Sequence, residues 1–263
     1  MRGKLVAVWS PCSGSGVTTL CTALISTMTR VGSVLALDLN HSEPSLALRA
    51  VRPGMVRTHL DSLLPMLRGR RLSPDELEPY ITPVGADSSV GVLAGFLHPM
   101  SAMQAQEADI HTLLDSALAK ADIVLADLNP TLDAVTTWPV LERADKVIWA
   151  VGGSYESRYH TRRHLPLQEQ LGFTPERVTL TYIATHSVPM AQAAEEIGAM
   201  PDIGIPGASA LREHEAHIKL SQMPGAYRKA VLELAQMVDG RLSKRAKAGF
   251  RWLGVRRAAH AER

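Results

Sequence analysis

Residues 10–19 read Ser-Pro-Cys-Ser-Gly-Ser-Gly-Val-Thr-Thr, and their glycines and hydroxyls are those of a phosphate-binding loop. In such a loop, backbone N–H groups and the N-terminus of the next helix hold the phosphates, while a lysine contacts the β- and γ-phosphate oxygens. A Ser or Thr hydroxyl binds the accompanying Mg²⁺. The nucleotide-binding residues predicted here are Gly14, Ser15, Gly16, Val17, Thr18 and Thr19. Val17 occupies the lysine position, so the loop is expected to bind phosphate without its usual cation.

Two carboxylates follow apolar runs elsewhere in the chain. Asp38 comes directly after residues 34–37, and Asp127 comes directly after residues 123–126. Open α/β sheets build their ligand sites at the carboxyl ends of parallel strands, so both carboxylates are expected near the phosphate loop.

The elements that must position these residues alternate between strand and helix patterns, which predicts a single doubly wound α/β fold: a mostly parallel sheet with helices on both faces. Apolar runs predict strands near residues 4–9, 34–38, 79–84, 90–95, 123–127, 146–151, 178–184 and 203–205. Helical spacing is found at residues 17–30, 106–120, 155–171, 189–199 and 225–242. The loop then lies between the first strand and the first helix, as phosphate binding requires.

Length and composition fit one large domain over residues 1–242. The chain has 263 residues, 46% of them hydrophobic, enough to bury a full core around one sheet. Its two cysteines, Cys12 and Cys21, have no metal-ligand spacing and suggest a reducing compartment. The N-terminus runs straight into the first predicted strand, so no signal peptide is expected, and no apolar run approaches the ~18 residues of a transmembrane helix.

Residues 243–263 form a separate basic, amphipathic C-terminal tail. Residues 241–263 contain eight Lys or Arg and one Asp or Glu, whereas the rest of the chain is acidic overall. Bulky apolar residues among cations can seat a helix at anionic headgroups. The membrane contacts predicted are Phe250, Trp252, Leu253, Lys247 and Arg251. A basic segment that touches nucleic acid is the alternative.

Three segments together resemble the MinD/ParA group of deviant Walker-motif P-loop ATPases, including the MinD-type and pilus-assembly CpaE/TadZ-type members. They are VWSPCSGSGVTTL, VLALDLNHSEPSLAL and ADIVLADLNP, and a looser resemblance extends to about residue 240. It implies that Thr18 and Asp127, the Walker B carboxylate, hold Mg²⁺, and that Asp38 orients the metal shell and the attacking water. ATP or ADP with Mg²⁺ would be the ligand, and no other cofactor is expected.

The sequence departs from the family pattern at both lysines. Val17 replaces the loop lysine, and Cys12 stands where the signature lysine reaches across a dimer. At the end of the strand near residues 178–184, where relatives often place an Asn against the base, this chain has Ala184-Thr185-His186. The expectation is therefore weak nucleotide binding and a pseudo-ATPase. The alternative is a slow active ATPase with a cation supplied by Arg158, Arg162 or Arg163, residues that otherwise form a solvated helix face.

The resemblance and the tail together imply a cytoplasmic protein, peripheral at the inner face of the cell membrane. It would be a homodimer that organises a bacterial surface or division assembly, such as a pilus, secretion system, flagellum or septum, with the partner assembly unidentified. A single tail would bind only marginally, whereas two tails on a dimer act by effective concentration. A ParA-like DNA-binding partition protein is the alternative within the family.

Overall fold

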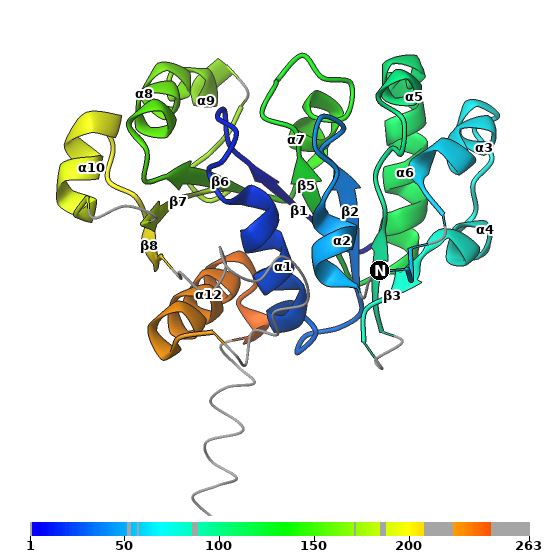
Figure 1. Ribbon diagram of the computed structural model, residues 1–263, viewed down its shortest axis with the longest axis horizontal. Coiled ribbons are helices and arrows are strands. Elements are labelled where there is room, and N and C mark those ends of the chain that lie inside the picture. Colours follow the sequence, from blue (N-terminus) through cyan, green and yellow to red (C-terminus); the bar gives the residue numbers. More distant parts are fainter. Residues whose placement is uncertain are drawn as a thin grey trace, which may run out of the picture.

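The computed structural model describes residues 2–51, 54–56, 58–85, 89–170, 172–184, 188–207 and 223–242. The predicted tail, residues 243–263, lies outside these residues, as do Thr185 and His186. Figure 1 shows a central sheet with helices packed on both of its faces.

One eight-stranded sheet runs through the protein in the order β3-β4-β2-β5-β1-β6-β7-β8. Its strands are β1 (Lys4–Trp9), β2 (Val34–Leu39), β3 (Thr82–Pro83), β4 (Val90–Leu93), β5 (Ile123–Leu128), β6 (Lys146–Gly152), β7 (Val178–Ala184) and β8 (Ile203–Pro206). Every pairing is parallel except that of β3 with β4. The prediction of a mostly parallel α/β sheet is confirmed.

The central strands are apolar runs because both of their faces are covered, as expected for parallel strands. Alternate residues of β1 enter two different cores: Leu5, Ala7 and Trp9 pack on one face, while Val6 and Val8 pack on the other. The carboxyl ends of β1, β2 and β5 consequently lie side by side at one edge of the sheet.

Different sets of helices cover the two faces of the sheet. The face of Val6 and Val8 is covered by α1 (Val17–Met28), α2 (Leu46–Ala50) and α12 (Gly225–Val238). The opposite face is covered chiefly by α6 (Glu107–Lys120), α7 (Trp138–Arg143) and α10 (Met190–Ile197), together with the short elements that precede α6. Those elements are η1 (Leu60–Leu63), α3 (Leu64–Arg68), α4 (Pro74–Leu77), η2 (Glu78–Tyr80) and α5 (Pro99–Gln104). The result is the three-layer arrangement expected from the sequence.

Two expected elements differ from the structure. The strand predicted near residues 79–84 is only the two-residue β3, because η2 carries a proline at its start and the chain turns there. The helix predicted over 155–171 is divided into α8 (Tyr155–His164) and α9 (Leu167–Gln170) around Pro166. Proline removes a backbone donor and clashes with the preceding turn, which accounts for the break.

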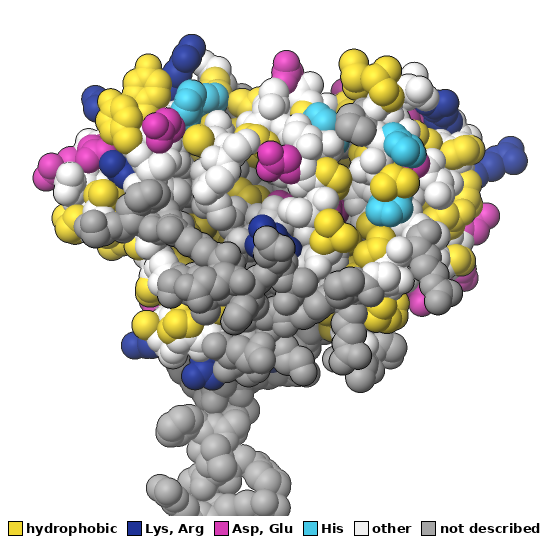
Figure 2. Space-filling model, viewed as in Figure 1, with side chains coloured by type: hydrophobic (Ala, Val, Ile, Leu, Met, Phe, Trp, Pro, Cys, Tyr) yellow, Lys and Arg dark blue, Asp and Glu magenta, His cyan; other side chains and the backbone are white. Residues whose placement is uncertain are grey.

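Exposed apolar side chains gather at two places on the face shown in Figure 2. One group lies at α5 and the turn before it, with Leu97, Met100 and Met103, and the other is Tyr155 and Tyr159 on α8. No helix among the described residues is long and apolar enough to cross a membrane.

Candidate functional site

The phosphate loop joins the buried strand β1 to helix α1, as the sequence predicted. Gly14 and Gly16 adopt positive φ angles of 73° and 88°, a region that side chains with a Cβ rarely enter. Gly16 is the N-cap of α1, and a Cβ added there would lie 3.1 Å from Cδ1 of Ile183. These two glycines turn the backbone toward the N-terminal end of α1, where a helix dipole favours anions.

The loop is held in place by a hydrogen-bonded serine pair. The Ser15 hydroxyl donates to the backbone oxygen of Cys12 (2.7 Å) and lies 2.8 Å from the Ser157 hydroxyl of α8. Ser157 also accepts from the backbone N–H of Gly152 at 2.8 Å. A Cβ on Gly152 would lie 2.9 Å from Cα of Ser15, so only glycine permits this close approach. The loop is therefore pinned to the junction between β6 and α8.

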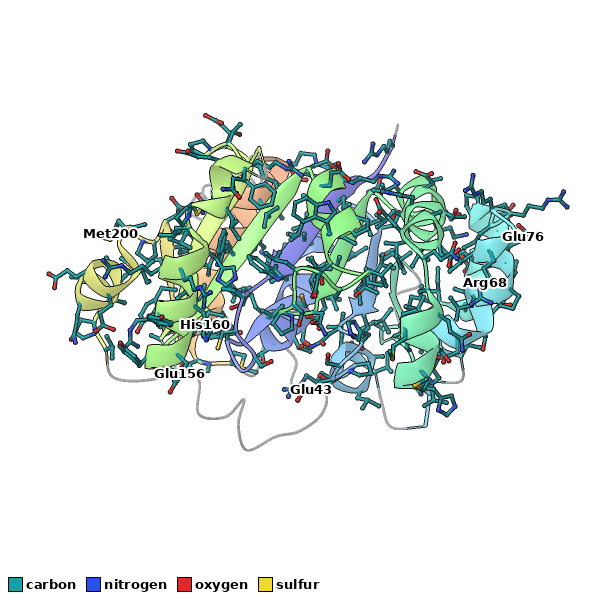
Figure 3. All side chains as sticks on the ribbon, turned by 90° about the horizontal axis from the view of Figure 1, so that it is seen from above. Glu43, Arg68, Glu76, Glu156, His160 and Met200 are labelled. Carbon is teal, nitrogen blue, oxygen red and sulfur yellow. The ribbon has the colours of Figure 1, made fainter. Side chains whose placement is uncertain are left out.

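A cleft of about 260 Å³ opens over the loop. All six predicted nucleotide-binding residues, Gly14 to Thr19, line it. The opposite wall comes from the segment after β2 and includes Asn40, Glu43 and Arg49. Seen from above, Glu43 and His160 of α8 lie on opposite sides of the loop (Figure 3).

Asp127 lies at the end of β5, completely buried, and neither of its carboxylate oxygens has a hydrogen-bond partner among the described residues. Burial raises its pKa to about 7, while the Thr18 side chain and the positive charge of Arg49 act in the opposite direction. The contact with Thr18 therefore influences the carboxylate without completing a hydrogen bond to it. Unpartnered oxygens beside a hydroxyl are what a hard cation such as Mg²⁺ binds.

Asp38 lies at the end of β2, directly beside Asp127 in the sheet register. Its Oδ2 accepts hydrogen bonds from the backbone N–H groups of Leu46 (2.9 Å) and Ala47 (3.4 Å) at the start of α2. Its Oδ1 is buried and has no partner among the residues described. Burial, and next the charge of Asp127, raise the pKa of Asp38 well above its usual value. Asp38 thus anchors α2 with one oxygen and leaves the other available.

The residues at this edge fit a Mg²⁺ ion. The donors are the Thr18 hydroxyl, the two Asp127 oxygens and Oδ1 of Asp38, all oxygen atoms of the kind that Mg²⁺ prefers. The family resemblance implied Thr18 and Asp127 as metal ligands, and the structure places the Thr18 side chain beside the Asp127 carboxylate. The expected role of Asp38 in orienting an attacking water stays a prediction.

The two positions where the family has lysine hold no positive charge. Val17, the first residue of α1, lines the cleft and also packs against the core beneath the helix. Cys12 lines the cleft as well, and burial raises the pKa of its thiol, so it stays neutral near pH 7. The loop alone therefore offers a phosphate only backbone groups, hydroxyls and a helix N-terminus.

Arg158 has neither of the two roles that the sequence suggested for it, a cation for the nucleotide or part of a solvated helix face. Arg158 is 5% exposed, and its guanidinium donates to Glu196 of α10 at 2.6 Å and to the backbone oxygen of Gly153. It holds α8 against α10 and is absent from the cleft. Arg162 and Arg163 are exposed on α8, as expected for a solvated helix face. Neither residue lines the cleft.

Arg49 is the cleft residue that the sequence did not indicate. It lies in the last turn of α2, half-buried, and is the one basic side chain among the described residues that line the cleft. Nothing in its local sequence marks it, because it follows an apolar run at ordinary helical spacing. The packing of α2 against α1 and β2 places it there.

A second hollow of about 420 Å³ lies on the other side of the loop. It is lined by Pro11, Cys12 and Ser13, by residues 130–132, and by His160 and His164 of α8. Cys12 therefore faces both hollows. Cys12 is the position at which the resemblance places the lysine that reaches across a dimer.

A glycine loop between a buried parallel strand and a helix, with carboxylates at the ends of the two neighbouring strands, defines a P-loop NTPase type of α/β fold. No family model matches the chain, and no curated protein matches it by sequence.

Solved structures give a more specific assignment of the fold. A ParA family ATPase from Chlorobium tepidum superposes with a TM-score of 0.75 at 14% identity, covering 89% of this chain and 98% of that one. MinD of Pyrococcus horikoshii with Mg-ADP gives a TM-score of 0.67 at 18% identity, covering 90% and 96%. MinD in the MinC:MinD complex of Aquifex aeolicus gives 0.69 at 16% identity, covering 90% and 96%. The chain has the MinD/ParA fold.

Proposed function

We propose that this chain binds a nucleoside diphosphate or triphosphate with Mg²⁺ and hydrolyses it slowly or not at all. One observation carries the proposal: the loop presents Thr18 beside the unpartnered, buried oxygens of Asp127, while Val17 and Cys12 occupy both lysine positions. The first half of that arrangement favours a metal-bound phosphate. The second half removes the positive charge that hydrolysis needs.

Loss of the lysines should reduce nucleotide affinity less than it reduces the rate of hydrolysis. A hydrogen bond to a charged group contributes roughly 1.5–3 kcal/mol, so losing one lysine weakens affinity about ten- to a hundredfold. Phosphoryl transfer depends almost entirely on positioning and charge stabilisation, and it suffers more when both cations are missing. Binding can therefore survive where turnover does not.

A role in spatial organisation follows from the fold relatives. One solved neighbour is named a cell division ATPase, another is a putative plasmid partition protein bound to AMPPNP, and a third is in complex with MinC. We propose that this chain likewise acts as a homodimer that positions a bacterial surface or division assembly. Its basic tail, residues 243–263, would recruit it to the inner face of the membrane.

A nucleotide titration by calorimetry, with and without Mg²⁺, tests the binding proposal. Wild type should bind ADP, and Mg²⁺ should strengthen the binding. Thr18→Ala should remove the Mg²⁺ effect because the hydroxyl contributes to the metal shell. Thr112→Ala, which removes a hydroxyl on α6 that donates to the Ala108 oxygen, is a matched control. Absence of ADP binding by the wild type would overturn the proposal.

Turnover is measured on the same samples. Phosphate release should be far slower than the ~1 s⁻¹ at the low end of common enzymes. Turnover near that rate, abolished by Asp38→Ala, would contradict the pseudo-ATPase interpretation. It would instead favour a slow ATPase with a compensating cation, a candidate that gains support from the presence of Arg49 in the cleft.

A further inference from the structure

We propose that Arg49, on helix α2, replaces the missing loop lysine as the cation that contacts the phosphates of the bound nucleotide. The proposal rests on nucleotide binding at the loop, as proposed above, and adds the residue that neutralises the phosphate charge. The cation would thus come from the segment after β2 and not from the loop itself.

The first support is position. Arg49 lines the same cleft as Val17 and Thr18, on the wall facing the loop. The cleft is lined by Arg49 and by every residue from Gly14 to Thr19, so a phosphate chain held by the loop backbone occupies the space that Arg49 lines.

The second support is the anchoring of α2. Leu46 and Ala47 are buried, and their backbone N–H groups donate to Oδ2 of Asp38. Arg49 lies two residues further on, with its own N–H donating to the Ser45 oxygen at 3.1 Å. A carboxylate of the proposed metal site thereby fixes the backbone from which the arginine extends.

The third support is the distribution of the other cations near the sheet. Arg158 is engaged by Glu196 and by the Gly153 oxygen, and Lys4, at the opposite end of β1, donates to the Val238 oxygen at 2.6 Å. Arg49 makes no ion pair with any residue within the described ranges. Among the described residues, Arg49 is therefore the basic side chain that lines the cleft and makes no ion pair.

The chemistry suits a polyphosphate. A guanidinium offers a planar fork of donors that can contact two phosphate oxygens at once, whereas a lysine acts as a point charge. Glu43 lines the same cleft and is exposed, so it opposes a bare anion, and Arg49 or a bound Mg²⁺ would offset it. The ligand class is a nucleotide with at least two phosphates.

The test is an ADP titration by calorimetry on the full chain. Arg49→Ala should weaken binding roughly ten- to a hundredfold, and Arg49→Lys should recover part of that loss. Arg162→Ala, which removes an exposed cation outside the cleft, should leave affinity unchanged. In the Arg49→Ala background, Val17→Lys should restore binding, because it returns the cation to its usual position. Melting temperatures of all variants establish that each is folded.

The outcomes distinguish this inference from the proposed function. If the wild type binds ADP and Arg49→Ala binds it equally well, the assignment of Arg49 is wrong while nucleotide binding stands. If the wild type binds no ADP, both are wrong. If Arg49→Ala unfolds, Arg49→Gln keeps a polar side chain without the charge, and unchanged affinity in that variant also overturns the assignment. A loss that Val17→Lys does not repair assigns Arg49 a role in holding the cleft wall and contradicts phosphate contact.

Discussion

Asp38 and Asp127 are paired directly across the parallel strands β2 and β5, so two carboxylates lie side by side at the buried carboxyl edge of the sheet. Asp38 is 1% exposed and Asp127 is 0% exposed. Three of their four oxygens have no hydrogen-bond partner among the described residues. Burying such groups destabilises a fold unless a cation or a proton neutralises them, so this carboxylate pair lowers the stability of the metal-free protein where both groups are ionised.

The first prediction concerns the loss of stability that comes from burying the Asp127 carboxylate. The pKa of Asp127 is raised from 3.8 to about 7, so the folded protein holds a proton that the unfolded chain has lost. The contribution of Asp127 to the free energy of unfolding therefore falls as pH rises from about 4 to 7 and stays at its lower value above 7. Asp127→Asn removes the titrating group and should raise the stability of the metal-free protein at pH 8 by roughly 2–4 kcal/mol.

Thermal melts at pH 5 and pH 8 in EDTA measure this effect. The gain from Asp127→Asn should be large at pH 8 and small at pH 5, where the wild-type carboxyl is protonated. Asp115→Asn is the control, because that carboxylate is exposed and ion-paired with Arg143 at 2.5 Å. An equal change at both pH values would contradict the raised pKa.

The fold could be predicted from the sequence because its signals are local. The central strands are continuous apolar runs, and the glycine loop between residues 4–9 and 17–30 fixes the first strand–helix unit. The same patterns placed Asp38 and Asp127 at strand ends, and the sheet register then brought them together. Residues 79–84 were assigned wrongly because Pro79 and Tyr80 belong to the 3-10 helix η2, which leaves only the two-residue strand Thr82–Pro83.

The cations of the site could not be predicted in the same way. Arg158 follows Gly152-Gly153 in the sequence and looked available, but the packing of α8 on α10 pairs it with Glu196. Arg49 carries no motif, and it reaches the cleft because α2 donates two hydrogen bonds to Asp38 and buries Leu46 and Ala47. Both outcomes depend on contacts between residues distant in sequence, and a local pattern does not encode them.

The second prediction concerns the serine pair that pins the loop. Ser157→Ala removes the hydroxyl that contacts Ser15 and accepts from the Gly152 N–H, leaving a buried donor without a partner. The cost in stability should be about 1–3 kcal/mol. ADP affinity should fall as well, because the loop must then be ordered on binding. Ser116→Ala is the control, since its buried hydroxyl lies on α6 and bonds the Leu72 and Thr112 oxygens. Loss of stability with unchanged affinity would show that the loop keeps its shape unaided.

The third prediction separates Arg158 from the site. Arg158→Ala breaks a largely buried ion pair with Glu196, so it should lower the free energy of unfolding by roughly 2 kcal/mol. Nucleotide affinity should not change, because Arg158 lies outside the cleft. Chemical denaturation and ADP titration of Arg158→Ala and Glu196→Gln check both statements. A drop in affinity specific to Arg158→Ala would return this residue to the list of phosphate-binding cations.

The fourth prediction concerns the C-terminal tail, whose apolar residues and cations are expected to act together at anionic bilayers. Deleting residues 243–263 should release the protein from vesicles that contain phosphatidylserine or cardiolipin, as measured by co-sedimentation. Phe250→Glu combined with Trp252→Glu should release it nearly as well while leaving every Lys and Arg in place. Phe250→Leu with Trp252→Leu keeps the apolar character and serves as the matched control.

A tail that binds nucleic acid instead would depend on Lys and Arg and lose affinity steeply with salt. If the double Glu variant sediments with vesicles as the wild type does, the interfacial helix is wrong and the tail acts through its charge alone.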